Sequence, residues 1–131
     1  MPSAIDTNVL IRFLVDDGSE HVAPARRLLS SGQFFVSLSV MLETEWVLRS
    51  YFGFQRAQIC DAFDRVLGFD AMLFQERRVL ENAVEACRAG MDFADALHLN
   101  TAVDCDVFYT FDKKLIRNAE RNIPNRPVRE P

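Results

Sequence analysis

Residues 4–11 read AIDTNVLI, and they set the expected architecture of the chain. A short apolar start leads into the carboxylate of Asp6, which two small polar residues and an apolar run follow. This order is typical of a strand that ends where a helix begins. In parallel α/β proteins, ligands bind outside the carboxyl ends of the strands. We therefore expect Asp6 at such an edge, where a carboxylate either binds a metal ion or caps the helix.

The remainder of the chain alternates short apolar runs with amphipathic segments. This alternation predicts an α/β protein with a mainly parallel sheet of four to five short strands. The expected strands are 2–6, 34–37, 71–74 and 106–110, with a possible edge strand around Val128. The expected helices are 7–16, a segment from the turn at 17–19 to 31, 40–52 with Ser39 as its cap, 55–67, 76–89, 92–103 and 112–120.

Length and composition indicate one domain over 1–131. A chain of 131 residues with 49% hydrophobic residues can bury a substantial core. No apolar run approaches the roughly 18 residues of a membrane span, and no signal peptide is recognisable. Cys60, Cys87 and Cys105 form no C-x-x-C pair, which fits reduced thiols and a cytoplasmic location.

The charge balance bears on nucleic-acid binding in two ways. A net charge of -4 argues against binding by bulk electrostatic attraction. The basic residues, however, are all arginine except Lys113 and Lys114, and the guanidinium group suits bidentate contacts to phosphate.

The segment expected to form the third helix carries two glutamates. Glu43 has Trp46 and Val47 as its i+3 and i+4 neighbours, which would place it among apolar side chains. Glu45 lies four residues before Arg49, so we expect an ordinary solvent-exposed ion pair. This comparison favours Glu43 as the functional acid, although a lone glutamate at a rim that reaches water is an open alternative.

Three further aspartates precede or open helical segments. Asp92 and Asp95 start a segment of small and apolar residues, and Asp112 follows the apolar run at 107–111. Helix capping explains each of them taken singly. His98 in the same segment has no second His or Cys placed to complete a zinc site.

Taken together, Asp6, Glu43, Asp95 and Asp112 could meet at the carboxyl edge of one sheet. Clustered acids repel one another unless a cation neutralises them, and all-oxygen ligands suit Mg²⁺ or Mn²⁺. The chemistry that follows is phosphodiester hydrolysis by metal-activated water. The chain contains neither G-x-x-x-x-G-K-[ST] nor G-x-G-x-x-G, so other nucleotide-binding folds lack their motifs.

These segments resemble the motifs of PIN-domain nucleases. Residues 5–10 are similar to the opening motif, Glu43 matches the second acid, residues 95–102 resemble the third motif and residues 110–112 the fourth. The resemblance spans nearly the whole chain and is strongest to the VapC toxins of toxin–antitoxin pairs. It implies a PIN-like, Rossmann-like three-layer α/β/α sandwich.

The resemblance also implies an activity, a cofactor and partners. These are a Mg²⁺-dependent endoribonuclease with Mn²⁺ as a possible substitute, an RNA substrate, a VapB-type antitoxin, and a homodimer or higher toxin–antitoxin assembly. Asp6, Glu43, Asp95 and Asp112 carry over as catalytic acids, with Asp6 and Asp95 as metal ligands. The supporting residues that carry over are Asn8, Thr110 and Asp92. His98 and Asn100 stand where many relatives have small or apolar residues, so they receive no role.

Two other functions stay open. A metal phosphatase with a Rossmann-like sheet would commonly have a second acid where this chain has Asn8. A non-catalytic PIN-like interaction module would be expected to have an incomplete set of acids, whereas this set is complete.

Overall fold

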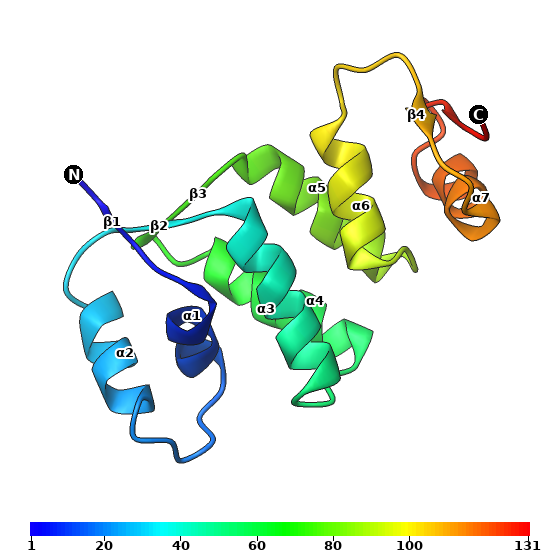
Figure 1. The fold of residues 1–131 in the computed structure, drawn as a ribbon. Coiled ribbons are helices and arrows are strands. Elements are labelled where there is room, and N and C mark those ends of the chain that lie inside the picture. Colours follow the sequence, from blue (N-terminus) through cyan, green and yellow to red (C-terminus); the bar gives the residue numbers. More distant parts are fainter. The chain divides into compact units, whose positions relative to one another are not determined.

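The computed structural model describes residues 1–131 and contains two compact units, Met1–Arg77 and Arg78–Pro131 (Figure 1). The elements of the N-terminal unit are β1 (Ser3–Ala4), α1 (Thr7–Leu14), α2 (Val22–Leu29), β2 (Phe34–Val36), α3 (Leu38–Ser50), α4 (Arg56–Leu67) and β3 (Met72–Phe74). Those of the C-terminal unit are α5 (Arg77–Arg88), α6 (Phe93–Thr101), β4 (Phe108–Tyr109), α7 (Lys113–Asn122) and β5 (Val128–Arg129).

All strand pairs are parallel. In the N-terminal unit β2 lies between β1 and β3, with Phe34 opposite both Ser3 and Met72. In the C-terminal unit β4 pairs with β5, with Phe108 opposite Val128. The predicted α/β class, the short parallel strands and the additional strand at Val128 are confirmed, but the five strands pair as a three-stranded and a two-stranded sheet rather than as one sheet.

The helices of the N-terminal unit pack side by side. Helix α1 contacts both α2 and α3, and α3 also contacts α4. The buried side chains of α1 follow helical spacing, because the first, fourth and fifth residues of the helix face inward. The fully buried large side chains of this unit are Leu10, Ile11, Leu29, Val36, Met41, Leu48, Phe63 and Val66.

Two predicted helix ends are wrong because local polar side chains intervene. Helix α3 begins earlier than expected, since the hydroxyl of Ser37 rather than Ser39 accepts from the Val40 N–H at 3.1 Å. Helix α1 ends at Leu14 rather than residue 16. Beyond that end, Asp16 and Asp17 accept from the backbone N–H groups two residues later and form turns.

The core face of α3 corrects another prediction. Its buried residues are Met41, Thr44, Glu45 and Leu48, at the spacing of one helical stripe. Glu45 is only 5% exposed, so the prediction of an ordinary solvent-exposed Glu45–Arg49 pair is wrong. None of the helices combines the length and the apolar character needed to cross a membrane.

Candidate functional site

Asp6 lies between β1 and α1, as predicted, and caps the helix. Its Oδ1 accepts from the backbone N–H of Val9 at 3.2 Å. Asp6 is exposed, and its second carboxylate oxygen makes no hydrogen bond within the protein. Capping and ligand binding are therefore compatible at this residue, because the cap occupies one oxygen and leaves the other available.

A hydrogen bond connects the start of α1 to α3. The buried hydroxyl of Thr7 donates to Oε1 of Glu43, which is exposed. Because Thr7 directly follows Asp6, the bond orients the Glu43 carboxylate at the start of α1. Glu43 is expected from the sequence and Thr7 is not, although a small polar residue directly after Asp6 on the inward face of a helix is a usable signal.

The environment predicted for Glu43 is wrong. Trp46, its i+3 neighbour, is 58% exposed, so Glu43 does not lie among buried apolar side chains. The buried acid of the helix is Glu45, which accepts from Arg49 Nε at 3.1 and 3.3 Å. The assignment of Glu43 to the site now depends on its contact with Thr7 and on the motif it matches.

The acids of the C-terminal unit also lie at helix starts. Asp92 caps α6 by accepting from the Asp95 N–H at 3.1 Å. Asp112 caps α7 through Oδ1, which accepts from Lys114 and Leu115 at 2.9 and 3.1 Å. The Thr110 hydroxyl accepts from the Asp112 N–H at 3.0 Å and so holds the start of this turn.

Asp95 is the acid of this group whose ionisation is disfavoured. Burial is the main cause that raises the pKa of Asp95, and the negative charges of Asp92 and Asp112 raise it further. His98 and Lys114 partly oppose this increase in pKa. The negative charges of Asp92 and Asp112 therefore act on the Asp95 carboxyl group and disfavour its ionisation.

The candidate acids offer the type of donor atom that hard cations prefer. All four catalytic candidates carry carboxylate oxygens, and two of them, Asp6 and Asp112, each keep one oxygen outside their capping bonds. Oxygen donors of this kind suit Mg²⁺ and Mn²⁺ rather than zinc. Within either unit by itself, no three His, Cys, Asp or Glu side chains form a group that could hold a metal ion.

Comparison with protein families identifies the chain. The sequence model of the PIN domain matches residues 4–121, which include most of both units. The chain belongs to the PIN-domain family. PIN domains are in general nucleases, so the membership supports a hydrolase that acts on nucleic acid and favours this class over a phosphatase. A comparison with curated proteins found no match.

The raised pKa of Asp95 predicts a stability change in this PIN domain. We expect Asp95→Asn to raise the unfolding temperature of the metal-free protein at neutral pH. The folded protein holds the Asp95 proton more tightly than the unfolded chain does, so the ionised carboxylate costs stability as the pH rises through the raised pKa. Below the ordinary value of 3.8 the cost disappears, and the two proteins should converge.

Thermal unfolding followed by circular dichroism at neutral pH and at about pH 3 measures this difference. Asp104→Asn is the matched control, because Asp104 is an exposed aspartate in the same unit. An Asp95→Asn protein less stable than the Asp104→Asn protein at neutral pH would contradict the interpretation.

Proposed function

We propose that this PIN domain is a Mg²⁺-dependent endoribonuclease and the toxin of a VapBC-type toxin–antitoxin pair. The observation that carries the proposal is that the motif acids Asp6 and Asp112 keep a free carboxylate oxygen while capping their helices. Helix capping therefore leaves one carboxylate oxygen of each of these two motif acids available. Glu43 and Asp95 complete the proposed catalytic set.

The chain's own side chains have distinct proposed roles. Asp6 and Asp95 bind the metal ion, Thr7 orients Glu43, and Thr110 orients Asp112. Asn8 is exposed beside Asp6, where its amide can contact a phosphate oxygen. When bound, Mg²⁺, or Mn²⁺ in its place, supplies charge stabilisation on the phosphate and lowers the pKa of water.

We further propose that residues 1–131 function as one PIN domain, because a single family match runs across both compact units. A homodimer is the expected assembly. Sedimentation of the purified chain measures its oligomeric state directly.

Surface side chains of α3 support an antitoxin partner. Trp46 and Tyr51 are 58% and 78% exposed, and Trp46 lies one helical turn from Glu43. A segment with an apolar anchor and an Arg or Lys side chain would complement this surface. Leu10 and Leu48, on the same two helices as Asn8 and Glu43, are fully buried and belong to the core rather than to this surface.

The decisive experiment is cleavage of labelled RNA by the purified chain with Mg²⁺, with Mn²⁺ and with a chelator. We expect cleavage with either ion and none with the chelator. Absence of cleavage with both ions, together with harmless expression of the chain alone, would indicate a non-catalytic module. Release of phosphate from small phosphate esters without RNA cleavage would indicate a phosphatase.

A pull-down from the native host tests the partner. We expect a small protein whose C-terminal segment contains Arg or Lys. Reversing that charge should restore RNA cleavage before the complex dissociates, because apolar anchors supply much of the affinity.

A further inference from the structure

A cavity of about 390 Å³ lies between α1 and α2 in the N-terminal unit. It includes Asp6 and Asn8, so it is continuous with the candidate site. This volume lies within the range of small-molecule sites in proteins. The rest of its wall combines apolar and basic side chains: Val9, Arg12, His21, Pro24, Ala25 and Leu28.

Arg12 has hydrogen-bond donors without acceptors. Its Nη1 donates to Asp17 Oδ2 at 2.8 Å, whereas its buried Nε has no partner and its Nη2 makes no hydrogen bond within the protein. Because Nε is buried, the donors of Arg12 that remain for a ligand in the cavity are the second N–H of Nη1 and those of Nη2, and this end of the guanidinium also suits a bidentate contact. An acceptor bound to these free donors would add charge-assisted hydrogen bonds.

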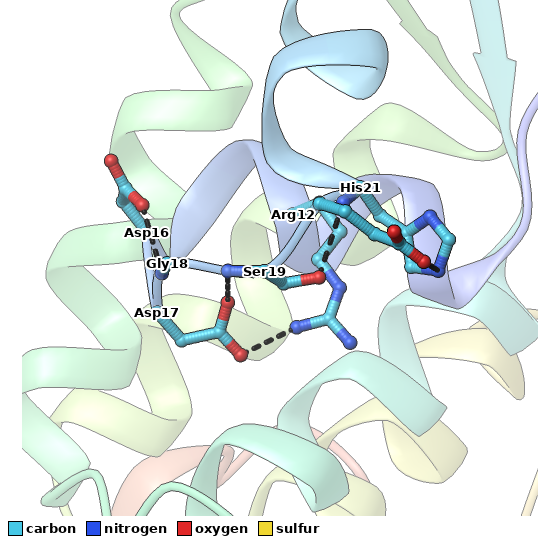
Figure 2. Close-up of polar contacts among 7 residues, drawn as sticks. Arg12, Asp16, Asp17, Gly18, Ser19 and His21 are labelled. Carbon is cyan, nitrogen blue, oxygen red and sulfur yellow. Dashed lines mark hydrogen bonds and ion pairs between the residues drawn. The ribbon is translucent and has the colours of Figure 1, made fainter.

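The loop that holds Arg12 is ordered by its own side chains (Figure 2). Asp16 accepts from Gly18 N–H, Asp17 from Ser19 N–H, and the Ser19 hydroxyl from His21 N–H. The hydrogen bond from Ser19 is the main cause that lowers the pKa of Asp17, and Arg12 lowers it further. Asp17 therefore remains ionised and keeps the guanidinium in place.

We propose that this cavity binds one nucleotide of the RNA substrate, with guanine as its preferred base. The base lies against the apolar side chains of Pro24 and Leu28, and its O6 and N7 acceptors face Arg12. Arginine bound to these two atoms of guanine is the commonest base-specific contact of proteins with nucleic acid. The proposal rests on the proposed ribonuclease function, since it places the nucleotide beside Asp6.

The charges around the cavity favour a base over a free anion. Asp17 is paired with Arg12 and offsets its positive charge, so the cavity attracts a free phosphate or carboxylate ligand only weakly. Guanine is neutral, and its N–H groups can donate hydrogen bonds to a carboxylate. Single-stranded RNA is commonly recognised in this way, with a base enclosed and read along its polar edge.

The first test measures binding of GMP, AMP, CMP and UMP to the intact protein without metal, by saturation-transfer NMR and calorimetry. We expect GMP to bind most tightly. Arg12→Lys should weaken GMP binding by about tenfold, because lysine keeps the charge but cannot make the bidentate contact. Leu28→Ser should weaken the binding of all four nucleotides. The fold should tolerate this change, because Leu28 is 44% exposed.

Arg26→Lys is the matched control. Arg26 contacts the same loop through Asp16 at 3.9 Å but does not line the cavity. The Arg26→Lys substitution should leave GMP binding unchanged. Ribose 5-phosphate tests the phosphate group alone. Equal affinity for all four nucleotides, ribose 5-phosphate that binds as tightly as GMP, or no effect of Arg12→Lys would overturn the proposal.

The second test sequences the ends produced from RNA with randomised positions. Wild-type protein should prefer guanine at one position near the cleaved bond, Arg12→Lys should relax that preference, and Arg26→Lys should retain it. An unchanged preference in Arg12→Lys would overturn the inference while leaving the ribonuclease function intact. If the wild-type protein cleaves no RNA, the proposed function fails, and the nucleotide-binding test still decides what the cavity binds.

Discussion

Asp6→Asn is expected to lower the rate of RNA cleavage by about a thousandfold or more, since losing a metal ligand removes several kcal/mol of transition-state stabilisation. The fold should persist, because asparagine caps a helix about as well as aspartate and can keep the bond to Val9 N–H. Initial rates with labelled RNA at saturating Mg²⁺ measure the loss. Circular dichroism of the same samples verifies that the protein is folded.

Asp16→Asn is the control for this substitution. Asp16 is an exposed acid beyond the other end of α1, and its bond to Gly18 N–H can also be made by asparagine. Its cleavage rate should match that of the wild type. A folded Asp6→Asn protein that cleaves RNA at the wild-type rate would remove Asp6 from the site.

Substitutions at Glu43 and Glu45 are expected to affect different properties. The first should affect RNA cleavage and the second the stability of the fold. Glu43→Gln should lose most cleavage with little change in stability, because Glu43 is exposed and a neutral amide cannot replace its charge. Glu45→Ala should lower the free energy of unfolding by roughly 2 kcal/mol, since it truncates a buried side chain. Folded Glu45→Ala should cleave RNA normally.

Urea denaturation and initial cleavage rates measure the two effects. If Glu45 were exposed, as its spacing to Arg49 indicates in the sequence, its substitution would lower the free energy of unfolding by less than about 0.5 kcal/mol. Glu85→Ala, at an exposed acid of α5, provides that reference. Loss of activity in folded Glu45→Ala with normal activity in Glu43→Gln would assign the functional acid to the other face of the helix.

The order of helices and strands could be predicted because it depends on local signals. Apolar runs bounded by polar residues and glycines placed every helix and strand to within a few residues. Gly53 and Gly90, which directly follow the expected helices 40–52 and 76–89, have positive φ values of 70° and 120°. The boundaries that were wrong, at Ser37 and at Asp16, depend on which of several nearby polar side chains bonds the backbone.

The sequence by itself determined the α/β class, the PIN-domain membership and the acids at the helix starts, because capping and periodicity act over three or four residues. The tertiary structure decided which face of α3 is buried, that Thr7 bonds Glu43, and that one edge of Arg12 lacks acceptors. Thr7 and Glu43 are 36 residues apart in the chain. No local pattern specifies such a contact, because it arises only when α1 and α3 pack against each other.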